Sequence, residues 1–146
     1  MADLLECVIQ IKALADTPRR LALRLRESHA REAFDAGAVL RGLLVYESWL
    51  QSAIEAGRSA TDAEACAEPV FDATCGVAPA SAESPEILVA RFASLRAATV
   101  HRLDSLTAAQ LSSTVLVARR GRTTVADLVA LALAHDTDSI AWIVRS

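Results

Sequence analysis

Residues 124–139 read Thr-Val-Ala-Asp-Leu-Val-Ala-Leu-Ala-Leu-Ala-His-Asp-Thr-Asp-Ser, and this stretch is the most informative in the chain. Thr124 and Asp127 resemble a capping box, and the alanines and leucines after them are strong helix formers. We therefore expect a last helix that runs to about Arg145. His135 and Ser139 are four residues apart, so they lie one turn apart on the same helix face. Two histidines at this spacing would form half of a metal site, but here the second position holds a serine.

The composition of the remaining chain favours helices as well. Apolar residues make up 53% of the 146 residues, few are aromatic, and most are Ala, Leu and Val. This length suits one compact domain, which we take to be residues 1–146. The formal charge of −3 and the pI near 5.6 argue against a surface that binds nucleic acid.

Features that indicate cellular location are few. The N-terminal residues are acidic and lack the basic start of a secretory signal. No apolar run approaches the roughly 20 residues that span a bilayer. Cys7, Cys66 and Cys75 match no zinc spacing and leave one cysteine over in any disulfide scheme. We expect a cytoplasmic protein with reduced thiols and no contact with membranes.

Three further helices are predicted from apolar spacing and caps. The first starts at residues 4–14, is interrupted near Pro18, and restarts there with Thr17 as its cap. The second covers residues 35–56, with Gly57 as its stop. Ser84, followed by a proline and a glutamate, opens the third, whose buried stripe is taken as Leu88, Phe92, Leu95, Val100 and Leu103.

The connections between these helices are of unequal length. Residues 58–83 show no sustained periodicity and form a long crossover, with a short helical turn expected at 62–66. Residues 107–110 are a capping box for one short extra turn. Residues 114–117 are β-branched and extended, and 119–122 form a turn. Four long helices with one long connection between the second and third predict an all-α four-helix bundle.

The order of several short motifs resembles one family. These are Leu14-Ala-Asp-Thr17-Pro18, Val39-Leu40-Arg-Gly42-Leu43-Leu44-Val-Tyr46-Glu47, Arg91-Phe92-Ala-Ser-Leu95, Gly121-Arg-Thr-Thr124 and Ala134-His135-Asp136-Thr-Asp138-Ser139-Ile140-Ala-Trp142. Together they resemble the DinB/YfiT-like superfamily over nearly the whole chain. The resemblance implies an up–down–down–up helical bundle that often dimerises. It also implies a divalent metal, held by one histidine in the second helix and two, spaced as His-x-x-x-His, in the last.

Two of the three metal-ligand positions implied by the resemblance have lost their ligand. The second-helix position falls on Gly42, and the last-helix positions fall on His135 and Ser139. Glycine has no donor atom, and a serine hydroxyl is a poor ligand for divalent metals. We therefore predict no tightly bound metal and no cofactor, with weak divalent binding at most.

The candidate site is nevertheless expected around His135. This histidine is either a surviving ligand or general base, or a histidine that is hydrogen-bonded inside the bundle. Glu47 is the second candidate catalytic residue, and either pairs with His135 or is a carboxylate at the rim. A rebuilt metal site would add Asp136 or Asp138. The full pocket predicted from the sequence is Gly42, Tyr46, Glu47, His135, Asp138, Ser139 and Trp142.

These observations leave two main hypotheses for function. The first is a degenerate, non-catalytic DinB-like homodimer whose former metal pocket binds a small molecule or nothing. The alternative is a thiol S-transferase-like or isomerase-like enzyme that works without the three-histidine site. We expect the dimer because Leu128, Val129, Leu131 and Leu133 surround much of the last helix, and because the mean hydropathy is +0.30. A DNA-binding module is the weakest hypothesis on charge grounds.

Overall fold

The computed structural model describes residues 4–27, 34–60, 62–70 and 84–145. These residues form four long helices, one short helix and three short strands. The elements are α1 (Leu4–Glu27), α2 (Phe34–Ser59), β1 (Ala63–Ala65), α3 (Pro85–Asp104), α4 (Ala108–Leu111), β2 (Thr114–Val117), β3 (Gly121–Thr124) and α5 (Val125–Arg145).

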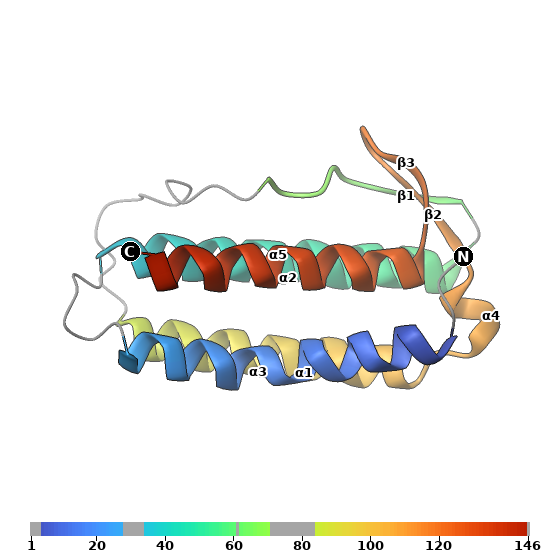
Figure 1. Cartoon of the computed structure of the whole chain (residues 1–146). Coiled ribbons are helices and arrows are strands. Elements are labelled where there is room, and N and C mark those ends of the chain that lie inside the picture. The colour runs from blue at the N-terminus through green and yellow to red at the C-terminus, as the bar shows by residue number, and fades with distance from the viewer. Residues whose placement is uncertain (1–3, 28–33, 61, 71–83, 146) are drawn as a thin grey trace.

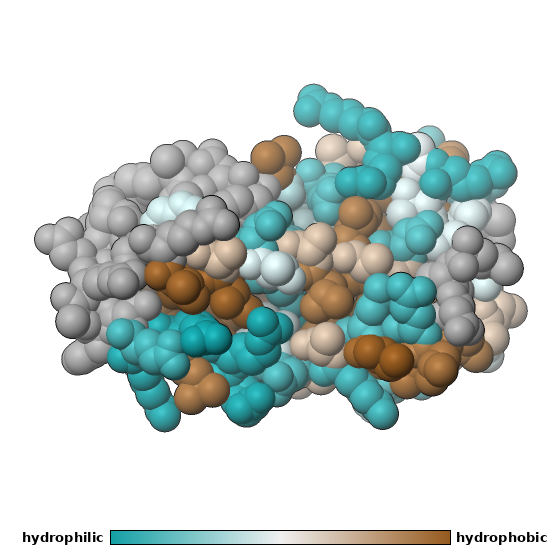
Figure 2. Space-filling model, viewed as in Figure 1, coloured by the Kyte–Doolittle hydropathy of each residue, from teal (hydrophilic) through white to brown (hydrophobic). Residues whose placement is uncertain are grey.

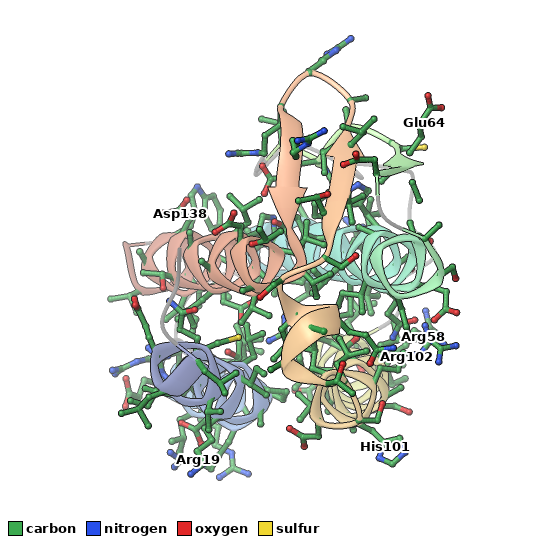
Figure 3. The ribbon with its side chains drawn as sticks, turned by 90° about the vertical axis from the view of Figure 1, so that its right-hand side faces the viewer. Arg19, Arg58, Glu64, His101, Arg102 and Asp138 are labelled. Atoms are coloured by element: carbon green, nitrogen blue, oxygen red, sulfur yellow. The ribbon has the colours of Figure 1, made fainter. Side chains whose placement is uncertain are left out.

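The four long helices form a bundle that is square in cross-section (Figure 3). Each of α1 and α2 packs against both α3 and α5, so α1 lies diagonally across from α2, as the end view in Figure 3 shows. Helices α1 and α5 run in one direction, and α2 and α3 run in the other (Figure 1). The predicted up–down–down–up bundle is thus confirmed.

Local caps start three of the helices as predicted. The Ser84 side chain accepts a hydrogen bond from the backbone N–H of Ile87, and Pro85 follows it at the first helical position. Thr107 and Gln110 form a complete capping box for α4. At α5, the backbone N–H of Asp127 donates to Thr124 Oγ1 at 3.0 Å, and the N–H of Thr124 donates to Asp127 Oδ2 at 3.3 Å.

The predicted interruption of the first helix is wrong, because α1 continues through Pro18. Thr17 does not cap a helix but lies buried within one. A proline inside a helix has no N–H for the carbonyl four residues earlier, which here is that of Leu14. Arg96 Nη1 donates to this carbonyl at 3.0 Å instead. A side chain from α3 thus supplies the hydrogen bond that Pro18 lacks.

The predicted helix stop at Gly57 is also wrong, since α2 continues to Ser59. Gly57 meets the start of α5 and the strand β2. A Cβ atom at this position would lie 2.6 Å from Val125 Cγ2 and 2.8 Å from Val115 Cγ2. Glycine is therefore required here by the close approach of its neighbours, not by a turn of the chain.

The crossover begins with a strand, so the helical turn predicted at 62–66 is wrong. Strand β1 pairs in parallel with β2, and β2 pairs antiparallel with β3. The β2–β3 hairpin confirms the extended segment and the turn predicted after it, with Arg119 and Gly121 at positive φ. This small sheet stands on one end of the bundle, above α2 and α5 (Figures 1 and 3). The rest of the crossover, residues 71–83, lies outside the described residues.

Two apolar clusters fill the bundle. One lies toward the sheet and includes Leu14, Leu50 and Ala132. The other lies toward the opposite end and includes Leu21, Phe92 and Ile140. Along α1, α2, α3 and α5 the switch from one cluster to the other coincides with buried polar side chains. We call these the polar layer: Thr17, Glu47, Arg96 and Asp136.

The surface carries its apolar side chains in a different place from the one predicted. On α5, Leu128 and Val129 are fully buried and Leu131 and Leu133 are partly buried within the chain. Large exposed apolar side chains gather instead where α1 begins (Figure 2). We call these the α1 patch: Leu4, Leu5, Val8 and Ile9. None of the helices in the described part of the chain has the length and apolar character needed to cross a membrane.

Candidate functional site

The core of the site is a pair of stacked rings from two antiparallel helices. Tyr46 of α2 and His135 of α5 have ring centroids 3.9 Å apart and planes inclined by only 20°. Trp49 contacts the same tyrosine edge-on, at a centroid distance of 5.2 Å. Both stacked rings are buried, with His135 only 8% exposed. Tyr46 and His135 were both assigned to the predicted pocket, and in the structure they are in direct contact.

Hydrogen bonds hold the chain after β1 against these rings. Tyr46 donates its hydroxyl hydrogen to Glu68 Oε2, and Arg120 of the hairpin donates to Glu68 Oε1 at 3.0 Å. Trp49 Nε1 donates to the carbonyl of Cys66 at 2.8 Å. Sequence reasoning missed Glu68, because its position depends on the pairing of β1 with β2. These bonds hold the start of the crossover against α2.

Burial sets the protonation states of both rings. It lowers the pKa of His135 from its usual value near 6.5, although the negative charges of Asp136, Glu68 and Asp138 oppose this shift. Burial, together with the hydrogen bond to Glu68, raises the pKa of Tyr46. At neutral pH the site therefore presents a neutral imidazole and a neutral phenol.

The three positions at which the resemblance implies metal ligands do not supply a suitable donor set. Ser139 is fully buried, and its hydroxyl donates to the backbone carbonyl of His135 at 2.8 Å. At Gly42, a Cβ atom would meet nothing within 4 Å. One imidazole, one hydroxyl already bonded to the backbone and one glycine do not make the three- or four-donor set of a zinc site. In the described residues, no three His, Cys, Asp or Glu side chains are grouped so that they could hold a metal ion.

Glu47 is buried, but its partner is not the one predicted. Both of its carboxylate oxygens accept hydrogen bonds from Arg96, each at 2.9 Å. The predicted pairing of Glu47 with His135 is therefore wrong, and so is the alternative of a carboxylate at the rim, because Glu47 is fully buried. Glu47 belongs to the polar layer rather than to the ring pair.

Arg96 is the residue of this region that sequence reasoning missed. The stripe on α3 that is fully buried includes Arg96 and Thr99, whereas the predicted Leu95 and Val100 are only half-buried. The available signal was spacing: Arg96 lies four residues after Phe92, whose ring it covers at 4.7 Å. The predicted stripe contained apolar residues alone, so this basic residue at a core position was left out of it.

The other predicted pocket residues are dispersed. Asp138 is exposed on the outer side of α5 (Figure 3). Trp142 is half-buried against the second apolar cluster. Cys7 is buried, with a pKa raised by burial, and Cys66 is exposed. Cys75 lies outside the described residues.

Comparisons with known proteins agree with this architecture. A family model of the DinB superfamily matches residues 11–143. Among solved structures, YfiT from Bacillus subtilis has a TM-score of 0.79 at 15% sequence identity, covering 99% of this chain and 87% of YfiT. YfiT is described as a probable metal-dependent hydrolase with an unusual four-helix bundle topology. A search of curated proteins found no match. At 15% identity the similarity to YfiT shows the fold alone.

Proposed function

The chain belongs to the DinB superfamily, and from this premise we propose that it binds a small organic molecule between α2 and α5 without a tightly bound metal. The metal positions implied by the family resemblance support the second half of this proposal. Gly42 offers no donor, and the hydroxyl of Ser139 is bonded to the backbone. A single imidazole, that of His135, is left, and one such ligand is too few for a stable divalent site.

The observation that carries the proposal is the space beside Gly42. Because α2 and α5 are antiparallel and Tyr46 stacks on His135, the next turn of each helix places Gly42 and Ser139 at the same level of the bundle. Both side chains are small, and a Cβ atom at Gly42 would meet nothing within 4 Å. A ligand at this level would rest directly beside the stacked rings.

The chemistry of the walls indicates the class of ligand. The rings of Tyr46 and His135 offer apolar faces, and Trp142 packs in the adjoining apolar cluster. A neutral imidazole can donate one hydrogen bond and accept another. The site therefore suits a small, neutral, flat molecule, such as an aromatic amide or a nitrogen heterocycle, rather than a phosphate or a metal chelate.

The test is binding of neutral aromatic probes to a variant in which the space is filled. Indole and benzamide are titrated into the protein while amide chemical shifts are recorded. We expect the shifts to move around Gly42 and His135, and we expect Gly42→Leu to lose this binding. Ser48→Leu, at an exposed position one and a half turns further along α2, is the matched control and should bind as the natural protein does. Equal binding by the Gly42 variant would contradict the proposal.

The enzymatic alternative receives no support from a particular contact. A thiol S-transferase-like or isomerase-like reaction needs an activated nucleophile or base with a positioned partner. Glu47, the predicted partner of His135, is occupied by Arg96. We therefore retain ligand binding as the proposed function.

We also propose that the chain is a homodimer. The apolar residues of the last helix no longer support the predicted dimer, because the chain itself covers most of that helix. The α1 patch now supports association, since its four side chains are 40% to 66% exposed on adjacent turns of one helix. A patch of this kind on a small protein is typical of a protein–protein contact.

A further inference from the structure

The polar layer joins all four long helices through a single side chain. Arg96 extends from α3 and is 1% exposed. Its guanidinium contacts Glu47 of α2, Asp136 of α5 and the carbonyl of Leu14 in α1.

The guanidinium has no hydrogen-bonding capacity left over. Arginine has five N–H groups, and the Arg96 side chain donates five hydrogen bonds of 2.7 to 3.0 Å. Nε and Nη2 meet the two oxygens of Glu47, and Nη1 and Nη2 meet the two oxygens of Asp136. The fifth bond goes to Leu14, whose carbonyl is accessible because Pro18 lacks an N–H. Such a planar, double-forked arrangement fixes both carboxylates in orientation as well as in position.

Asp136 transmits this restraint to the candidate site. Its Oδ2 atom also accepts the hydroxyl hydrogen of Thr17 at 2.7 Å, so that side chain is held from α1 and α3 together. Asp136 directly follows His135 in α5. Fixing the direction of one side chain on a helix turn fixes the direction of its neighbour, because successive residues are set about 100° apart.

We propose that Arg96 is a positioning residue for the site: by clamping Asp136, it sets the rotation of the α5 turn that stacks His135 on Tyr46. That this site binds a ligand is taken from the proposed function, and in this respect the proposal rests on it. A protein cation thus organises the centre of this bundle, and a resident metal is not needed for that purpose.

The charges of the layer make the proposal measurable. Asp136 and Arg96 act on His135 in opposite directions, the carboxylate raising its pKa and the guanidinium lowering it. Glu68 and Asp138 act with the carboxylate, and burial opposes them. Removing Arg96 leaves the negative charge of Asp136 without its compensating guanidinium beside the imidazole of His135. Neutralising Asp136 instead removes the negative charge that is nearest to His135 in the sequence.

The experiment is a histidine NMR titration of the full chain and three variants. In Arg96→Met we expect the pKa of His135 to rise, and in Asp136→Asn we expect it to fall, because the nearby charge changes in each variant. In both, the ring protons of His135 should lose the upfield shift caused by stacking on Tyr46. Arg102→Met is the matched control at an exposed arginine of the same helix.

A layer with a merely structural role would give a different result. Both variants would then melt at lower temperature, but the ring-proton shifts of His135 would match those of the natural protein, and the proposal would be overturned. If Arg96→Met does not fold, Asp136→Asn decides alone. The measurement needs no ligand, so failure of the probes to bind would count against the proposed function and not against the role of Arg96.

Discussion

Glu47 and Glu55 are two carboxylates on the same helix whose ion pairs differ in burial. Glu47 is fully buried with Arg96, whereas Glu55 pairs with Arg58 where both side chains are about half exposed. We expect Glu47→Leu to lower the free energy of unfolding by about 3–5 kcal/mol, because two guanidinium N–H groups lose their acceptors in a dry interior. Urea denaturation followed by circular dichroism measures this.

The exposed pair provides the control for that measurement. Glu55→Leu should leave the urea midpoint close to that of the natural protein, because solvent screens exposed pairs. Similar losses in the two variants would mean that the polar layer does not stabilise the bundle in the way that its geometry indicates.

Tyr46 makes a prediction at alkaline pH, and it is the single tyrosine in the chain. Burial and Glu68 raise its pKa above the usual value near 10. The folded protein then holds the phenolic proton more tightly than the unfolded chain does. Its stability contribution is complete below pH 10 and is lost as the pH rises above that value.

Absorbance at 295 nm follows this ionisation directly. We expect almost no tyrosinate signal in the folded protein near pH 10, and about half of the full signal at that pH in urea, where the phenol titrates near its usual value. Normal titration of the folded protein would show that the hydroxyl is accessible and that the crossover is not fastened over the rings.

At the scale of elements, two glycines of α2 should respond oppositely to the same substitution. Gly42→Ala should stabilise the protein by up to about 1 kcal/mol, because alanine is the better helix former and the new methyl group meets open space. Gly57→Ala should destabilise it by about 1–3 kcal/mol, because the methyl group would overlap Val125 and Val115. Thermal unfolding of the two variants compares these effects, and a change of the same sign in both would refute this description of α2.

The elements that could be predicted from the sequence are those with local causes. The caps at Ser84, Thr107 and Thr124 depend on side chains three residues away from the groups they bind, so a single stretch of sequence contains the whole interaction. The apolar spacing likewise placed the four long helices, because each buried stripe repeats within one helix.

The errors have long-range causes. Pro18 does not break α1, since Arg96 of a distant helix supplies the missing hydrogen bond. Gly57 does not end α2, since β2 and α5 require its small size. Strand β1 exists only through its pairing with β2, some fifty residues further along the chain. Within the candidate site, His135 and Tyr46 were placed through the family resemblance, whereas the partner of Glu47 depended on the rotation of α3.

At the scale of the whole molecule, the α1 patch makes a prediction about association. Light scattering at micromolar concentration should give twice the 15.5 kDa mass of the chain. Replacing Val8 and Ile9 by glutamate should give the monomer mass, because a two-fold interface contains the same surface from both subunits and therefore each substitution twice. Leu23→Glu, a similarly exposed apolar position further along α1, should remain a dimer. A monomer mass for the natural chain would end this proposal.

The central claim is that this bundle is organised around its own side chains and not around a metal. Elemental analysis of purified protein, dialysed against zinc and nickel and then freed of excess metal, tests it most directly. We expect far less than one metal ion per chain, because one imidazole stands where three ligands are needed. About one ion per chain, lost in His135→Ala, would contradict it.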